Sequence, residues 1–210
     1  MKNLKGLGLL LAVLFLSGCV LFGPVGPEIL YEENFNGDTE WYQGESEYSH
    51  WWVEGGKYHV LVKVEDKPIG TWRTDVGPFD NFQLDLDTEQ VAGPDDNGYG
   101  IRFRMQDTEN YYRFRISGDG WAKFDKRIGG VYTDIRPWST TELINEGNET
   151  NHMTVIANGS TFTFYINDTE LYSATDTSLT TGYIGFQVAM FVSPGQTHVA
   201  FDNLILTELE

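Results

Sequence analysis

Apolar and polar residues alternate along much of the chain. The apolar positions recur with a period of two in runs that begin at Phe82, Ile101, Tyr112, Met153, Phe162 and Ile184. This period is typical of strands with one buried face. Turn-forming sequences such as Gly93–Gly98 and Asn158-Gly159 separate the runs at spacings of roughly ten residues. No amphipathic helix pattern of useful length is found, so the sequence predicts an all-β sandwich or jelly roll.

The N-terminal segment has a different pattern. Lys2 and Lys5 precede an apolar run, Leu7–Leu16, which is too short to span a bilayer and has the length of a signal-peptide core. Small residues then lead to Cys19, the only cysteine of the chain. We interpret residues 1–18 as a cleaved lipoprotein signal peptide and Cys19 as the lipidated residue. The alternative is an ordinary secretory signal in which Cys19 is incidental.

The remaining chain is expected to form one domain behind a short tether. Residues 19–27 contain Gly23-Pro24 and Gly26-Pro27, which indicate a stiff linker, and residues 28–210 are expected to be a single β-sandwich domain. With no second cysteine there is no disulfide framework. We therefore expect an exported protein, lipid-anchored to a membrane, with its domain outside the cytoplasm at the periplasmic face or the cell surface.

Charge narrows the range of partners. The chain carries a net charge of −17, and removal of the two signal lysines leaves 12 basic against 31 acidic residues, a net of −19. Such a surface repels phosphate backbones, which argues against nucleic acid. An acidic surface also arises simply from the need for solvation. Eight of the 12 basic residues nevertheless fall between Arg102 and Arg136, and this local excess indicates a functional face.

The sharpest cluster consists of four arginines on two adjacent predicted strands. Strand alternation places Arg102, Arg104, Arg113, Arg115 and Tyr111 on one face of a hairpin joined at 107–110. Two interpretations stay open. In one, acids on adjacent strands neutralise the row in a salt-bridge lattice; the acids considered are Asp85, Asp87, Glu89 and Asp125. In the other, the guanidinium groups bind an anionic or hydroxyl-rich glycan.

Several stretches resemble a known superfamily. Residues 97–120, 151–167, 181–186 and 199–204 resemble successive hairpins and closing strands of concanavalin A-like lectin/glucanase modules, in particular laminin-G-like and 3-keto-disaccharide-hydrolase-like ones. Residues 33–41 resemble the first strand. The resemblance implies a jelly-roll β-sandwich of two antiparallel sheets, one of them concave and often ligand-binding. It does not determine function, because one scaffold serves many activities.

No intact catalytic motif accompanies this resemblance. Related glucanases carry a run of carboxylates on one strand, and the nearest run here is 83–89. Gln83 stands where the nucleophile would be, and an amide cannot form a glycosyl ester. Residues four apart on a strand also lie about 13 Å apart, farther than a retaining pair allows. We interpret the run as a solvent-facing strand edge, which favours a non-catalytic protein while enzyme activity stays open.

Two further sets of residues are candidates for binding. Trp121 and Trp138 are expected at strand ends or loops, where an exposed indole can stack on a sugar ring. No cofactor is required by the sequence, but the resemblance implies one structural Ca²⁺ near the first and last strands. Glu33, Asp38 and Asp202 are its candidate ligands. Asp202 alternatively caps a β-bulge.

Three functions follow, in order of preference. The first is a non-catalytic membrane-anchored module that binds a poly- or oligosaccharide. The second is an envelope lipoprotein that docks a partner protein, which an exposed apolar patch around Trp51-Trp52 would favour. The third, a glycoside hydrolase, rests on the resemblance alone.

Overall fold

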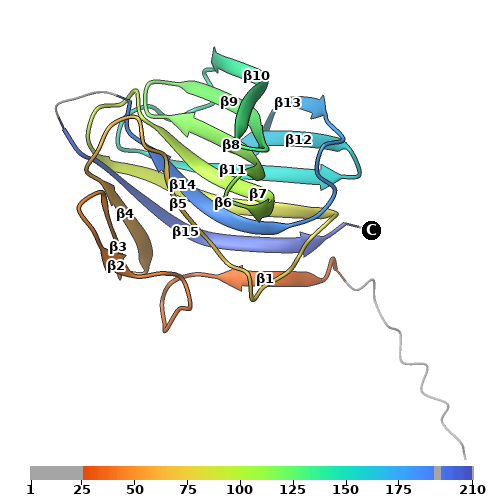
Figure 1. Cartoon of the computed structure of the whole chain (residues 1–210), viewed down its shortest axis with the longest axis horizontal. Helices are drawn as coiled ribbons and strands as arrows, with labels where there is room; N and C mark the ends of the chain where they lie inside the picture. The colour runs from red at the N-terminus through yellow and green to blue at the C-terminus, as the bar shows by residue number, and fades with distance from the viewer. Residues whose placement is uncertain (1–25, 192–194, 210) are drawn as a thin grey trace, which may run out of the picture.

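The computed structural model describes residues 26–191 and 195–209, and within them the chain forms two antiparallel sheets packed face to face (Figure 1). The first sheet contains β1 (Ile29–Glu33), β2 (Gly44–Glu45), β3 (Ser49–Glu54), β4 (Lys57–Val62), β6 (Phe82–Ala92), β11 (Thr150–Asn158), β12 (Thr161–Ile166), β13 (Thr169–Thr175) and β15 (Thr197–Glu208). The second contains β5 (Ile69–Trp72), β7 (Gly98–Asp107), β8 (Asn110–Ser117), β9 (Trp121–Ile128), β10 (Val131–Thr140) and β14 (Tyr183–Ala189). The predicted all-β jelly-roll sandwich is confirmed. In this part of the chain no helix is long and apolar enough to cross a membrane.

The nine-stranded sheet is organised around its longest strand, β15. Its order is β13-β12-β11-β6-β15-β4-β3-β2. One edge of β15 pairs with β6, while the other edge pairs first with β4, where Phe201 faces Tyr58, and then with β1, where Leu204 faces Glu33. Figure 1 shows β1 lying along β15 at the bottom of the molecule. The first and last strands of the described chain are therefore neighbours.

The six-stranded sheet has the order β10-β9-β8-β7-β14-β5, and four of its strands follow one another as hairpins. The turn between β7 and β8 is closed by Asp107, whose Oδ1 accepts hydrogen bonds from Glu109 N at 2.7 Å and Asn110 Nδ2 at 2.9 Å. A carboxylate that binds the backbone two residues ahead is a standard turn former. The hairpin joined at 107–110 forms as predicted, and a register shift between Phe103 and Asp107 places Arg102 opposite Arg113.

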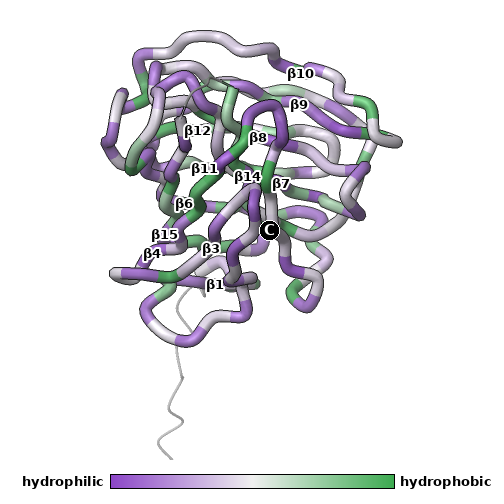
Figure 2. The backbone as a smooth tube through the Cα atoms, turned by 60° about the vertical axis from the view of Figure 1, so that its left-hand side comes forward, coloured by the Kyte–Doolittle hydropathy of each residue, from purple (hydrophilic) through white to green (hydrophobic). Residues whose placement is uncertain are grey.

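Aromatic rings from the two sheets interlock between them. Phe103, Phe114 and Phe124 of the six-stranded sheet contact Phe162 and Phe164 of the other, and Phe114 and Phe164 have ring centroids 4.5 Å apart. All five side chains are fully buried. Burial of each ring contributes about 1.5–3 kcal/mol relative to exposure. Figure 2 shows the hydrophobic positions along β6, β7, β8 and β11 in the interior. Because the apolar side chains of these strands pack in the core, the side chains that alternate with them lie on the outer faces of the sheets.

Three expectations need correction or lie outside the structure. The first strand ends at Glu33, and Phe35 is a buried loop residue with a φ of +52° rather than part of that strand. The 83–89 run lies on β6, a central strand between β11 and β15, and not on a sheet edge. Residues 1–25, with the signal peptide and Cys19, lie outside the described residues.

Candidate functional site

Three of the four predicted arginines lie together on the outer face of the six-stranded sheet. Arg102 comes from β7, and Arg113 and Arg115 come from β8. Arg102, Arg113 and Arg115 are 6%, 5% and 4% exposed. The row of charged residues is therefore buried. The guanidinium carbon of Arg102 lies 4.6 Å from the centroid of the Tyr111 ring. It also packs so closely on Gly70 that a Cβ there would lie 2.6 Å from it. A larger residue at position 70 would displace Arg102.

Arg104 is the exception, and its predicted place on this face is wrong. The pairing of β7 and β8 shifts register between Phe103 and Asp107, and Arg104 has a φ of +45°. Its guanidinium donates to the carbonyls of Leu179 at 3.0 Å and Asp80 at 2.7 Å. A β-bulge changes the direction of the residues that follow it, which a strict period of two does not anticipate. Arg104 therefore packs over the core ring of Phe162, at 5.0 Å from its centroid, and connects the loops that contain Asp80 and Leu179.

Asp125 of β9 is the centre of the remaining cluster. Its side chain is 1% exposed. Arg113 donates from Nε to Oδ1 at 2.7 Å and from Nη2 to Oδ2 at 2.6 Å, and Arg115 Nη2 donates to Oδ2 at 2.8 Å. Lys123 Nζ lies 3.7 Å from the same oxygen and 2.6 Å from Asp134 Oδ1. One buried carboxylate thus serves three cations. Burial, with the charge of Arg113, lowers the pKa of Arg115 to about 10.

Aromatic rings cover these cations. Tyr132 of β10 lies over Arg113, with 4.1 Å from the guanidinium carbon to the ring centroid, and Trp138 lies over Arg115 at 5.1 Å. The hydroxyls of Tyr111 and Tyr132 are 3.0 Å apart. Together these groups enclose a pocket of about 290 Å³, called here the Arg pocket. Its floor and walls are formed by Arg113, Arg115, Lys123, Asp125, Tyr132 and Trp138, with Asp66, Asp134 and Phe191 also lining it.

A second hollow adjoins the Arg pocket. The Trp121 hollow has a volume of about 250 Å³ and is lined by Asp96, Ser117, Asp119, Trp121, Trp138 and Phe191. Trp138 and Phe191 line both spaces, and their rings meet edge to face at 6.3 Å. Gly98 permits this, because a Cβ there would lie 3.0 Å from Phe191 and 3.2 Å from Trp138. Trp121 is 39% exposed at the start of β9, a strand end as expected, whereas Trp138 lies within β10 rather than at a strand end or in a loop. Both tryptophans line the Trp121 hollow.

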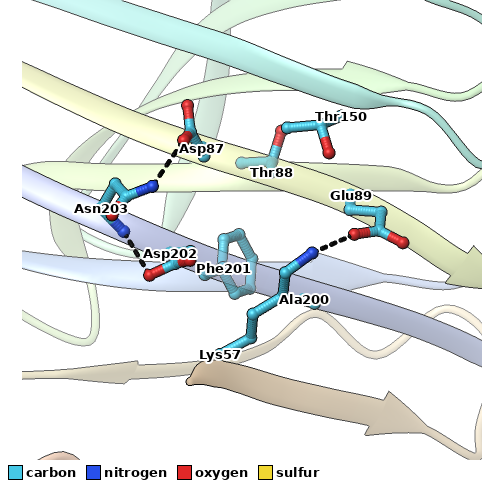
Figure 3. Close-up of a pocket in the computed structure, with 9 residues that line it drawn as sticks. All are labelled: Lys57, Asp87, Thr88, Glu89, Thr150, Ala200, Phe201, Asp202 and Asn203. Carbon is cyan, nitrogen blue, oxygen red and sulfur yellow. Dashed lines mark hydrogen bonds and ion pairs between the residues drawn. The ribbon is translucent and has the colours of Figure 1, made fainter. Parts of the chain in front are cut away.

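The outer face of the nine-stranded sheet carries different chemistry. A hollow of about 200 Å³ lies there, with residues of β6 and β15 in its lining. Lys57 pairs with Glu89 at 2.5 Å and Asn203 donates to Asp87 at 2.8 Å. Figure 3 shows these residues. Hydrogen bonds from His152 to Asp85 and Asp87 raise the pKa of His152 to about 10. These acids belong to the other sheet. Of the four carboxylates considered as partners for the arginine row, only Asp125 fills that role.

The proposed calcium ligands do not come together. Glu33 accepts hydrogen bonds from Phe35 N at 2.9 Å and Thr39 Oγ1 at 2.6 Å, whereas Asp38 is exposed. Asp202 accepts from Asn203 N at 2.7 Å, beside a register shift of β15, which matches the bulge-capping alternative. Over residues 26–191 and 195–209 no group of three or more His, Cys, Asp and Glu side chains is placed to hold a metal ion. Calcium binding itself stays a prediction.

Some pocket residues were missed by the sequence analysis. Lys123 and Asp125 are two residues apart on β9 and therefore share one face of the strand. The sequence pattern alone could have revealed this pair. Tyr132 and Asp134 lie on β10, the exposed outer strand of the sheet. The sequence of β10 has no apolar alternation from which a strand could be predicted. Phe191 follows β14 and reaches the pocket only through the fold.

Comparison with known proteins relates this architecture to a family. Residues 31–207 match the sequence model of the 3-keto-alpha-glucoside-1,2-lyase-like domain. No curated protein matches the sequence.

Solved structures share the fold at low identity. A carbohydrate-binding module, CBM66, from Bacillus subtilis aligns with a TM-score of 0.65 and 19% identity over 81% of this chain and 96% of its own. A Bacillus licheniformis β-glucanase aligns with a TM-score of 0.63 and 10% identity over 85% and 98%. A Bacillus subtilis protein of unknown function with a galectin-like fold gives 0.63 and 12% over 86% and 96%. Identities this low establish the shared sandwich fold alone.

Proposed function

The chain belongs to the 3-keto-alpha-glucoside-1,2-lyase-like domain family, and from this premise we propose that it binds a carbohydrate in the Arg pocket without catalysing its cleavage. The observation that carries the proposal is the pocket itself. Its floor offers buried guanidinium donors beside Asp125, and its walls are the rings of Tyr132 and Trp138. Sugars present hydroxyls at their edges and C–H groups on their faces, so polar groups beside aromatic rings match both.

The adjoining Trp121 hollow supports a ligand longer than one sugar. It shares Trp138 and Phe191 with the Arg pocket, so an oligosaccharide lying across these two rings occupies both spaces. The neighbours in the fold comparison include a carbohydrate-binding module and a β-glucanase, which is consistent with carbohydrate as the ligand class. We therefore place the ligand on the outer face of β8, β9 and β10.

Asp125 is poorly suited to a catalytic role. Glycoside hydrolysis needs two carboxyl groups free to exchange protons or attack. Both oxygens of Asp125 already accept hydrogen bonds from arginines, so neither is free to attack a sugar. Asp134, at the pocket, is engaged by Lys123 at 2.6 Å. Side chains held in place by these contacts are better suited to binding a ligand than to catalysis.

A matched pair of tryptophan variants tests the proposal. Purified full-length protein is probed on an array of oligo- and polysaccharides, as wild type, as Trp138→Ala and as Trp52→Ala. Trp52 stacks on His50 and His59 on the opposite sheet and serves as the control. Binding by the wild type and the control, lost in Trp138→Ala, supports the proposal. Absence of wild-type binding to any glycan, or binding that survives Trp138→Ala unchanged, contradicts it.

We propose that a lipid on Cys19 attaches the protein to a membrane surface. The apolar run before this residue and its position as the chain's only cysteine support lipidation. Metabolic labelling with a radioactive fatty acid should mark the wild type and leave Cys19→Ser unlabelled. A Cys19→Ser protein that retains the label would remove the lipid anchor from the proposal.

A partner protein is the less supported alternative. It was expected to use an exposed apolar patch at Trp51-Trp52, but Trp51 is only 3% exposed and Trp52 is stacked between histidine rings. The glycan array therefore comes before a search for protein partners.

A further inference from the structure

Cations are concentrated around the Arg pocket, although the protein as a whole is acidic. The chain carries a net charge of −17. Among the residues that the structure describes, the pocket lining contains three cations, Arg113, Arg115 and Lys123, and three carboxylates, Asp66, Asp125 and Asp134. Arg102 and Arg127 lie beside it, packed on the rings of Tyr111 and Tyr132, and Glu109 lies near Arg127. A local cationic site within an acidic protein attracts an anion only at close range, because repulsion dominates elsewhere.

Three cations, Arg113, Arg115 and Lys123, surround one buried carboxylate in the pocket. Asp125 is the buried carboxylate there, and its oxygens already accept from Arg113 and Arg115. The structure gives neither arginine's Nη1 a hydrogen-bond partner within the described residues, and Arg115 Nε is buried without one. What the floor still offers is donors rather than acceptors. An acceptor group on a ligand is therefore the complementary chemistry.

Burial makes this concentration of positive charge unfavourable. Burial lowers the pKa of Arg102 and of Arg115, and the neighbouring charge of Arg113 lowers both further. Each guanidinium thus loses hydration while facing another cation. An anion that enters the pocket relieves the repulsion and satisfies the open donors at once.

We propose that the Arg pocket receives the carboxylate of an acidic sugar residue, which makes this protein a binder of carboxylated glycans. The inference rests on the proposed function and specifies its ligand class. A carboxylate is planar and accepts parallel hydrogen bonds from guanidinium groups, whereas a neutral hydroxyl accepts fewer and weaker ones. The pocket volume of about 290 Å³ is at the lower end for small-molecule sites, so it suits a single sugar residue.

The adjoining Trp121 hollow does not compete for the charged group. Its ionisable lining residues are Asp96 and Asp119, which repel a carboxylate, and its apolar lining is Trp121, Trp138 and Phe191. A neighbouring uncharged sugar fits that hollow. The acidic residue is therefore assigned to the Arg pocket.

The test compares acidic polysaccharides with forms that differ only at the carboxyl group. Polygalacturonate, alginate, hyaluronan and a sialylated glycan are each paired with a derivative whose carboxylates have been reduced to alcohols. Binding to full-length protein is measured by calorimetry. We expect at least one acidic member to bind about tenfold or more tightly than its reduced form, in line with a charge-assisted contact, and its affinity to fall as salt rises.

A lysine variant locates the effect. Lys123→Gln removes one cation from the pocket without disturbing the buried arginines and should weaken only the acidic form, by roughly fivefold. Lys57→Gln removes the same charge from the opposite sheet, where it pairs with Glu89, and should leave both forms unchanged.

The outcomes separate this inference from the proposed function. If neutral glycans bind as tightly as acidic ones, or only neutral glycans bind, and this binding requires Trp138, the acidic ligand is excluded. The carbohydrate-binding function then remains supported. Equal weakening by Lys123→Gln and Lys57→Gln also overturns the inference, because it would reflect overall charge. No binding to any glycan overturns both.

Discussion

The two outer faces of the sandwich are built by the same strand alternation and differ in what covers them. On the six-stranded sheet, aromatic rings of β10 lie over the arginines of β8, so these arginines are largely buried and Arg113 and Arg115 line the Arg pocket. On the nine-stranded sheet, Lys57, Glu89 and His152 stay partly exposed in pairwise contacts. The same residue types are therefore a buried network on one face and a solvated surface on the other.

This difference determines how much each face contributes to stability and to recognition. A buried ion network is costly to disrupt, because removal of one member leaves the others desolvated and unpaired. Solvated pairs are screened and contribute little. A face that holds its polar groups rigidly and out of water also suits ligand recognition, since little order is lost on binding. We therefore expect large effects on the first face and small ones on the second.

The largest expected effect follows from Asp125→Asn. The substitution leaves Arg113, Arg115 and Lys123 without their shared counter-charge, and we expect a loss of about 3–5 kcal/mol in the free energy of unfolding. Chemical denaturation measures it. Asp134→Asn, at a carboxylate 45% exposed, is the control and should cost about 1 kcal/mol or less. Similar losses for both variants would mean that the two environments do not differ as described.

Trp138→Ala should separate recognition from stability. The ring lines both hollows, so we expect about a tenfold or greater loss of glycan affinity, as for a central aromatic contact. Calorimetry on a glycan identified by the array gives the affinity, and thermal unfolding shows that the variant is folded. Trp52→Ala on the opposite face should keep wild-type affinity. If Trp52→Ala weakened binding as much, the ligand would not be confined to the six-stranded sheet.

His152 should make the second face sensitive to pH. Its folded pKa of about 10 lies above the usual value near 6.5, so the charged form stabilises the fold. That contribution is fully present below about pH 6.5 and disappears as the pH rises through about 10. Because the side chain is about one-third exposed, solvent screening limits it to about 1 kcal/mol. The unfolding free energies of wild type and His152→Asn should differ at pH 6 and converge near pH 10; a constant difference would exclude this ion pair as the cause.

The smallest effect is expected for Lys57 and Glu89. Their contact at 2.5 Å is between partly exposed groups, so a double-mutant cycle with Lys57→Ala and Glu89→Ala should give a coupling of about 0.2–1 kcal/mol. Urea denaturation of the four proteins measures it. A coupling as large as the loss in Asp125→Asn would remove the contrast between the faces.

Much of the fold could be predicted from the chain because strand alternation is a local property. The apolar runs from Phe82, Ile101, Tyr112 and Phe162 each form a strand whose apolar side faces the core. The turn at 107–110 uses its own side chains, so its hairpin also follows from adjacent residues. The opening strand was placed too late in the chain, because Phe35 is buried from a loop rather than from a strand.

The site depended on features that no local pattern contains. Arg104 left the predicted row because a bulge reversed its direction, and bulges depend on how two strands pair. Asp85 and Asp87 were as plausible as Asp125 for neutralising the arginines until sheet membership separated them. The sequence by itself determined the strand periods, the local excess of basic residues and the position of Cys19. Only the tertiary structure decided which acid meets which base and which rings cover them, because those contacts join residues whose proximity depends on strand order.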